Sequence, residues 1–179
     1  MPDNNPCGKK TIVFLHGWPA SQEAFEYQYN QLVPLGYRCI GIDTRGFGRS
    51  DKPLTGYNYN QLADDVLCVI KALNLQNIAL VGHSTGGAIA IRYMSRHKGF
   101  GVSRLILMAA AAPSLIKRPN FPYGQNAEDI KKTFIQGAYE DRPKMLRDFG
   151  SIFFYKKVSE PFSDWFFLLG LQASSRATI

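Results

Sequence analysis

The segment Gly82-His83-Ser84-Thr85-Gly86-Gly87 directly follows an apolar run, Ile78-Ala79-Leu80-Val81. A serine in the G-x-S-x-G pattern between a strand and a helix is typical of a sharp turn that lifts the serine hydroxyl above a sheet. Glycine is required on both sides because larger side chains would clash in so tight a turn. The pattern predicts that Ser84 is the nucleophile of a covalent acyl transfer, with a helix N-terminus beside it that favours negative charge.

A second motif, His16-Gly17-Trp18-Pro19, follows the apolar run at residues 11–15. In acyl transfer the attacked carbonyl oxygen becomes an oxyanion, and backbone N–H groups aimed at that oxygen stabilise it. We expect these donors to be the backbone amides of Trp18 and Thr85. We expect His16 to hold the loop, not to transfer a proton, and His83 to point away from the serine. A serine that merely caps a helix is the alternative interpretation, and the second motif disfavours it.

Strand-like and helix-like segments alternate through the first two thirds of the chain. Continuous apolar runs predict strands over 11–15, 37–42, 78–81 and 105–109, and helical spacing predicts helices near 25–32, 58–73 and 86–97. This alternation predicts an α/β fold, a parallel sheet with helices on both faces. The aromatic-rich segment after Pro113 predicts helices, so we expect a core over residues 1–112 and a helical lid over 113–179. Helices of an ordinary core remain the alternative for the second segment.

Composition narrows the classes of protein. With 179 residues, 45% of them hydrophobic, the chain can fill one core. Its net charge of +7 comes from scattered basic residues, so a nucleic-acid partner is not expected. The sequence lacks a signal-like start and a stretch of about 20 apolar residues, so no membrane partner is expected. Cys7, Cys39 and Cys68 lack the spacing of a metal site or a disulfide framework, and we expect the last two to be buried. These features predict no metal, no cofactor and a cytoplasmic location.

Three segments together resemble the α/β-hydrolase fold superfamily, in particular its cofactor-free haloperoxidase and aryl-esterase branch. They are the two motifs above, each with its preceding strand residues, and the segment Asp43-Thr44-Arg45-Gly46-Phe47-Gly48-Arg49-Ser50. The resemblance covers roughly residues 10–112. It implies a serine hydrolase of the carboxylesterase class, acting on small-molecule esters through a Ser84 acyl-enzyme. It also implies that acyl transfer to peroxide, giving peracids that oxidise halide, is a side activity, and that the loop at 43–50 braces the site.

The chain departs from this family where the triad should be completed. The resemblance implies an acid and a histidine beyond the lid, in the chain order serine, acid, histidine, yet no histidine follows His97. We therefore expect a C-terminally truncated fragment, with its last strand exposed as an apolar edge that invites self-association or a complementing chain. The alternative is a degenerate, non-catalytic hydrolase that serves as a binding or interaction module. A nucleotide-binding domain is disfavoured because neither glycine cluster has the required spacing or lysine.

Overall fold

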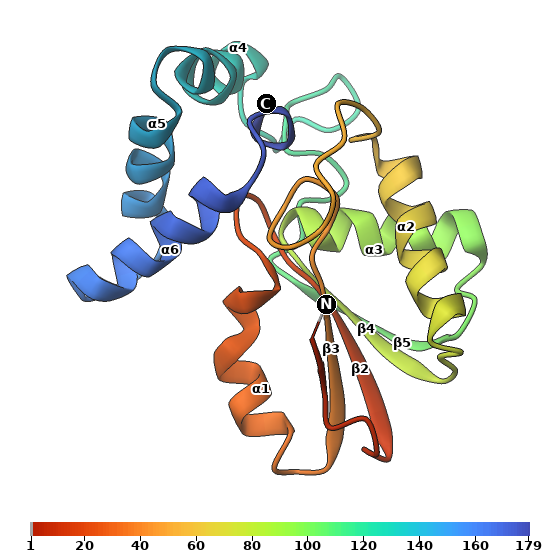
Figure 1. Ribbon diagram of the computed structural model, residues 1–179. Coiled ribbons are helices and arrows are strands. Elements are labelled where there is room, and N and C mark those ends of the chain that lie inside the picture. The colour runs from red at the N-terminus through yellow and green to blue at the C-terminus, as the bar shows by residue number, and fades with distance from the viewer. Residues whose placement is uncertain (1) are drawn as a thin grey trace.

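The strands form one mixed sheet at the centre of the molecule, in the order β1-β3-β2-β4-β5 (Figure 1). The structure is a computed structural model that describes residues 2–179. Neighbouring strands are parallel except for the first pair, β1 and β3. The strands are β1 (Asp3–Asn4), β2 (Lys10–Leu15), β3 (Tyr37–Ile42), β4 (Ile78–His83) and β5 (Val102–Met108).

Helices cover both faces of this sheet, which confirms the predicted fold class. Helix α1 (Glu26–Leu32) lies on one face, and α2 (Tyr59–Ala72) and α3 (Thr85–His97) lie on the other (Figure 1). Separate apolar cores fill the two interfaces. The central strands are buried on both faces, so nearly all their residues are apolar. This is why continuous apolar runs in the sequence predicted them.

The first strand was not predicted. Asp3 and Asn4 pair antiparallel with Ile40 and Cys39 of β3, and the Asp3 carboxylate forms an ion pair with Arg38 at 2.6 Å. A two-residue strand fixed by an ion pair leaves no mark in a hydrophobic pattern. It adds the one antiparallel pairing in the described residues, so the sheet is mixed.

The cysteine prediction is half correct. Cys39 is fully buried in β3, as expected of a small apolar side chain, but Cys68 is exposed on α2. The prediction for Cys68 was wrong because its apolar sequence neighbours, Leu67 and Val69, lie on other sides of the helix. Sequence proximity is not spatial proximity on a helical surface.

After β5 the described chain is mainly helical. Its helices are α4 (Ala127–Ile130), a π-helical turn (Lys131–Gln136), α5 (Gly137–Phe153), α6 (Glu160–Gln172) and a C-terminal 3-10 turn (Arg176–Thr178). They lie together beyond one end of the sheet, at the upper left of Figure 1. The division into a core over 1–112 and a cap over 113–179 remains our proposal. Within residues 2–179, no helix has both the length and the apolar character needed to cross a bilayer.

Candidate active site

Ser84 occupies a sharp turn between β4 and α3. Its backbone has φ 51° and ψ −119°, a positive φ that non-glycine residues rarely adopt. A Cβ atom added to Gly82 would lie 2.5 Å from the Gly86 carbonyl oxygen, and one added to Gly86 would lie 2.2 Å from the Leu15 carbonyl oxygen. The flanking glycines are therefore required by close backbone approach, as the sequence pattern predicts.

Backbone hydrogen bonds hold this strained turn in place. The Ser84 N–H donates to the Met108 carbonyl at 3.0 Å, and the Ser84 carbonyl accepts from the amides of Gly87 at 2.9 Å and Ala111 at 2.8 Å. Strained backbone persists at functional sites only where the surroundings determine it in this way. The serine is thus anchored to the end of β5 as well as to its own strand and helix.

The loop after β2 lies directly against the serine. A Cβ atom on Gly17 would lie only 2.8 Å from the Ser84 Cβ atom. The Trp18 N–H donates to the Thr85 hydroxyl oxygen at 2.9 Å. Thr85 is the first residue of α3, where backbone N–H groups have no partner within the helix. The Trp18 amide therefore follows the residue that packs against Ser84, and the Thr85 amide follows Ser84 directly in the chain. The sequence interpretation missed the hydroxyl contact, which joins residues 67 positions apart.

His16 ties two strand-end loops together. Its Nε2 accepts from the Thr44 amide N–H at 3.0 Å, so its Nδ1 carries the proton and donates to the Gly17 carbonyl at 3.0 Å. The side chain is buried, and this burial lowers the pKa of His16 below its usual value. With both ring nitrogens engaged, His16 holds the loop, in agreement with the prediction.

The loop after β3 is braced by a buried carboxylate. Asp43 accepts the Gln22 amide on Oδ1 at 2.8 Å and the Arg49 amide on Oδ2 at 3.1 Å. Its backbone carbonyl accepts the Ser50 hydroxyl at 2.6 Å. The loop with φ +49° at Gly48 passes so close that a Cβ atom there would lie 2.4 Å from the carboxylate. These bonds fulfil the bracing role expected of residues 43–50.

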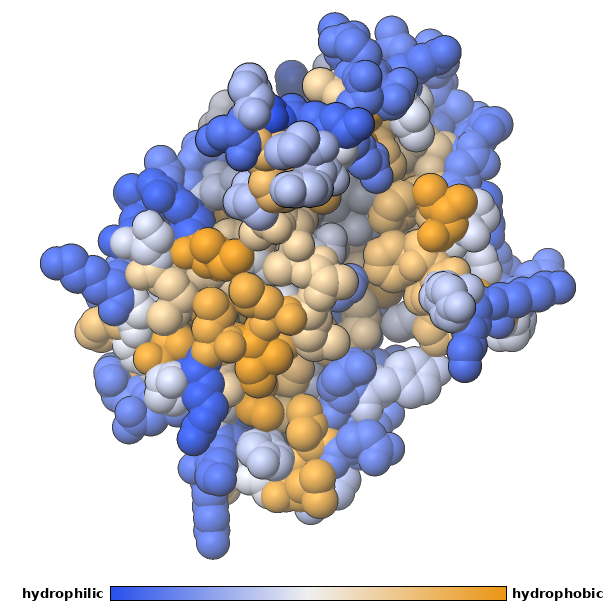
Figure 2. Space-filling view, turned by 180° about the vertical axis from the view of Figure 1, so that it is seen from behind, coloured by the Kyte–Doolittle hydropathy of each residue, from blue (hydrophilic) through white to orange (hydrophobic). Residues whose placement is uncertain are grey.

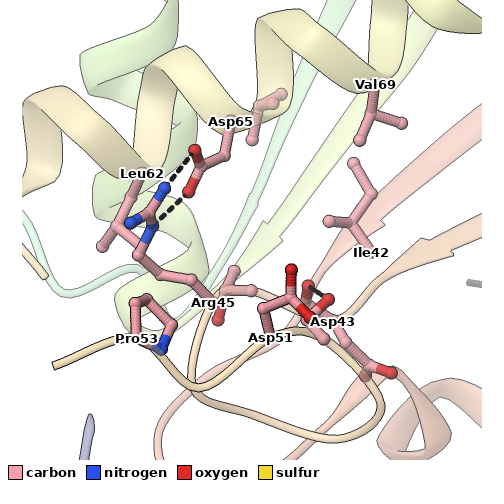
Figure 3. Close-up of a pocket in the computed structure, with 11 residues that line it drawn as sticks. Ile42, Asp43, Arg45, Asp51, Pro53, Leu62, Asp65 and Val69 are labelled. Carbon is pink, nitrogen blue, oxygen red and sulfur yellow. Dashed lines mark hydrogen bonds and ion pairs between the residues drawn. The ribbon is translucent and has the colours of Figure 1, made fainter. Parts of the chain in front are cut away.

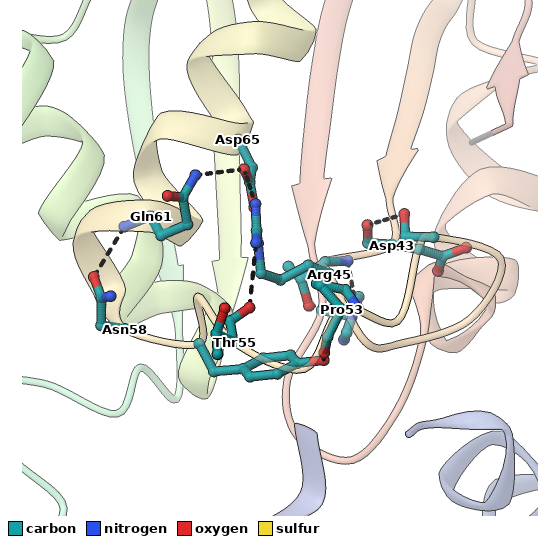
Figure 4. A network of polar contacts seen from close by, with 11 residues as sticks. Asp43, Arg45, Pro53, Thr55, Asn58, Gln61 and Asp65 are labelled. Carbon is teal, nitrogen blue, oxygen red and sulfur yellow. Dashed lines mark hydrogen bonds and ion pairs between the residues drawn. The ribbon is translucent and has the colours of Figure 1, made fainter. Parts of the chain in front are cut away.

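A second brace connects this loop to α2. Arg45 forms a two-pronged ion pair with Asp65, at 2.6 and 2.7 Å, and Gln61 donates to the same carboxylate at 3.1 Å (Figure 4). A cavity of about 400 Å³ opens beside this pair, between the end of β3 and α2 (Figure 3). Its lining includes none of Ser84, Trp18 and Thr85. We therefore assign no catalytic role to the cavity of Figure 3.

Two smaller hollows flank Trp18. One, of about 300 Å³, is lined by Trp18, Thr85 and residues of the C-terminal turn. The other, of about 200 Å³, is lined by Gly17, His83, Met108 and aromatic side chains. The Trp18 ring packs edge-on against Phe149 at 4.8 Å and Phe134 at 5.3 Å between ring centroids. Aromatic groups from the helical segment therefore cover the loop that carries the Trp18 amide.

The remaining two histidines contact other groups. The His83 ring packs against Phe153, and burial lowers its pKa. His97 ends α3, where its Nε2 lies 2.9 Å from Asp64. Within residues 2–179 no side chain forms a hydrogen bond with the Ser84 hydroxyl, and no cluster of side chains could hold a metal ion. Among the described residues, the Ser84 hydroxyl therefore lies in a strained turn beside the loop of Gly17 and Trp18, with no histidine in hydrogen-bond contact.

Comparison with known proteins shows which family this chain is similar to. Residues 10–176 match the model of the alpha/beta hydrolase fold family. The chain is 53% identical over 170 residues to the AB hydrolase superfamily protein YisY of Bacillus subtilis, across 95% of this chain and 63% of that protein. Two solved structures superpose closely: an esterase from Exiguobacterium antarcticum (TM-score 0.93, 46% identity, 96% of this chain and 64% of that one) and a bromoperoxidase from Bacillus anthracis (TM-score 0.92, 35% identity, 99% and 65%).

The chain therefore spans slightly less than two thirds of the length of these relatives. The match nevertheless covers the strands, the serine turn and the loop after β2. On this evidence the chain belongs to the α/β-hydrolase fold family.

Proposed function

We propose that this chain carries the nucleophile and the oxyanion hole of a serine hydrolase of the carboxylesterase class. Ser84 Oγ attacks the carbonyl carbon of a small ester, the alcohol leaves, and water then releases the acid from the acyl-enzyme. The amides of Trp18 and Thr85 donate to the oxyanion that forms in each step. The observation that carries the proposal is the strained turn at Ser84, which packs against Gly17 while the Trp18 N–H reaches the next residue, Thr85.

The substrate class follows from the surroundings of the serine. Trp18 and the phenylalanines of α5 present apolar, aromatic walls, which suit small apolar or aryl acyl groups. The solved relatives include an esterase and a bromoperoxidase. We propose ester hydrolysis as the main reaction and acyl transfer to hydrogen peroxide as the side reaction.

The base and acid of this site come, we propose, from polypeptide outside these 179 residues. A serine hydroxyl is a weak nucleophile until a neighbouring base removes its proton, and no described histidine contacts Ser84.

Fluorophosphonate labelling with chemical rescue tests this function. Ser84 Oγ displaces fluoride from phosphorus, and added imidazole accepts the serine proton in place of the missing base. We expect slow labelling of the purified chain and a marked acceleration by imidazole above pH 7, where imidazole is unprotonated. Peptide mass should place the adduct on Ser84. Ser84→Ala should abolish labelling, whereas Ser151→Ala, which removes an exposed serine hydroxyl on α5, should leave the rate unchanged.

The outcomes separate two functions. Labelling that persists in Ser84→Ala, or that maps to another residue, contradicts the proposed nucleophile. No labelling with or without imidazole, in a chain whose circular dichroism shows the fold intact, favours the non-catalytic binding module. That alternative is supported by the absence of a base in contact with Ser84 in the described residues.

The β5 edge is the proposed route of association. Leu105, Ile106, Leu107 and Met108 are 36–44% exposed although they are large apolar residues, and apolar side chains gather on the face shown in Figure 2. An edge strand of this kind pairs readily with another strand. We expect the purified chain to self-associate in light scattering and Ile106→Lys to make it monomeric. A wild-type chain that is monomeric at high concentration contradicts this.

A further inference from the structure

The Thr85 hydroxyl occupies one of the two oxyanion donors in the resting structure. The Trp18 N–H donates to the Thr85 hydroxyl oxygen at 2.9 Å, a normal length for a hydrogen bond. Both residues are partly buried, and the bond joins the loop after β2 to the first residue of α3. The other donor, the Thr85 amide, is the first N–H of the helix and lacks an intrahelical partner.

This bond competes with the proposed chemistry. An amide N–H makes one well-aligned hydrogen bond, because the interaction weakens steeply as its angle departs from linear. The Trp18 N–H therefore cannot serve the Thr85 hydroxyl and a substrate oxygen fully at the same time. Either the hydroxyl leaves when an oxyanion enters, or Trp18 is no oxyanion donor.

We propose that Thr85 is a positioning residue whose hydroxyl holds the Trp18 N–H in the resting site and releases it to the oxyanion. This inference rests on the proposed function, since it assigns the Trp18 amide to the same oxyanion hole. In the resting site, the hydroxyl oxygen accepts the N–H and so satisfies a partly buried donor. On reaction, the Thr85 side chain rotates about χ1 and the oxyanion takes the place of its oxygen.

The strength of the two acceptors favours this exchange at the right moment. A neutral carbonyl oxygen is no stronger an acceptor than a hydroxyl, whereas a hydrogen bond to an oxyanion is roughly twice as strong as a neutral one. Substrate carbonyl alone therefore displaces the hydroxyl poorly, and the developing oxyanion displaces it well. An interaction that strengthens only as charge develops raises the rate of the chemical step, not the affinity for substrate.

The structure provides space for the rotation. Trp18 and Thr85 both line the hollow of about 300 Å³ beside the site. A threonine hydroxyl has staggered alternatives about χ1, and in helices its side chain divides between two of them. The released hydroxyl can therefore turn toward this hollow without moving the backbone that carries the second oxyanion donor.

The resting bond can be observed directly by NMR. The sequence has two tryptophans, so labelling tryptophan with ¹⁵N gives one backbone amide signal for Trp18 and one for Trp165. Trp165 lies in α6 and serves as an internal reference; Trp165→Phe assigns the pair. Thr85→Val, which has the same shape but no acceptor, should move the Trp18 signal upfield and speed its hydrogen exchange about fivefold, the equivalent of one net hydrogen bond. Thr85→Ser, the matched control, should keep the wild-type signal.

The release is tested in the same samples after complete reaction with fluorophosphonate. The phosphonyl oxygen of the adduct then stands where the oxyanion would be. If the amide has passed to that oxygen, the Trp18 signals of wild type, Thr85→Ser and Thr85→Val move downfield and converge, because residue 85 is no longer the partner. The Trp165 signals should coincide throughout.

Each outcome decides the inference. Convergence in the adduct, after a difference at rest, supports it. Trp18 signals that still differ between wild type and Thr85→Val in the adduct overturn it, because the hydroxyl then retains the amide as a fixed structural contact. Equal signals at rest also overturn it. If peptide mass shows no adduct on Ser84, the proposed function fails and the release fails with it, a result distinct from an adduct that leaves the Trp18 amide unchanged.

Discussion

Replacing Gly86 with alanine tests the close approach that forms the serine turn. The added Cβ atom would lie 2.2 Å from the Leu15 carbonyl oxygen and 2.5 Å from that of His16. These distances fall about an ångström or more short of the ~3.5 Å at which non-bonded atoms pack favourably. Both oxygens belong to the backbone at the end of β2, which cannot turn aside as a flexible side chain can. The strand and α3 must therefore move apart.

The size of the effect follows from two opposing contributions. Alanine is favoured over glycine in a helix interior by about 1 kcal/mol, whereas overpacking of this kind costs typically about 1–3 kcal/mol and occasionally more. The clash involves two backbone oxygens, so we expect it to prevail, with a net loss of up to about 2 kcal/mol of unfolding free energy. For a chain of this size, that lowers the melting temperature by about 2–4 °C per kcal/mol.

Gly150→Ala provides the matched control. Gly150 lies inside α5, and the nearest atom to an added Cβ, on Phe166, is 3.6 Å away, an ordinary contact. The same chemical change should therefore stabilise the chain by about 0.5–1 kcal/mol through helix propensity. Urea unfolding followed by circular dichroism measures both variants. A Gly86→Ala chain as stable as Gly150→Ala, with its spectrum unchanged, would refute the reasoning from close approach.

Three further predictions concern the braces around the site. Burial lowers the pKa of His16 below its usual 6.5, so the unfolded chain binds the His16 proton more tightly than the folded chain does. The unfolding free energy should therefore fall as pH drops below about 6.5, by up to about 1.4 kcal/mol per pH unit. His16→Gln should flatten this slope in urea titrations, and an unchanged slope would count against the assignment. Arg45→Lys loses the two-pronged geometry with its partner carboxylate and should cost about 1 kcal/mol. Lys144→Ala, which removes an exposed pair on α5, should cost clearly less, because exposed ion pairs contribute little; equal losses in thermal unfolding would contradict this. Asn58 caps α2 by accepting a backbone N–H at 3.1 Å, so Asn58→Ala should lose about 1 kcal/mol and Asn58→Ser should retain most of it in the same assay.

Much of the candidate site could be predicted because each motif ends a parallel strand. The G-x-S-x-G turn ends β4, the histidine-glycine-tryptophan loop ends β2, and the loop that starts at Asp43 ends β3. Parallel neighbours bring these carboxyl ends to one edge of the sheet. Local patterns therefore located Ser84 and the loop bearing Trp18 without any knowledge of long-range contacts.

Features that depend on contacts between distant residues were not predictable in this way. The antiparallel strand at Asp3 depends on an ion pair with Arg38, 35 positions away. The exposure of Cys68 depends on which side of α2 faces the sheet. Neither feature leaves a local pattern, because each is decided by which surfaces meet after the chain has folded.

The Thr85 contact shows why the chemistry of a site needs both levels of description. Sequence pattern selects Thr85 by its position after the nucleophile, and that position concerns its backbone amide alone. The side chain at the same residue reaches the Trp18 amide, the other proposed oxyanion donor, 67 positions earlier. In our proposal, one residue thus contributes an amide to the oxyanion hole and a hydroxyl that occupies the other donor at rest. A substitution at this position acts on both proposed donors at once, so its effect on reactivity cannot be read from the motif.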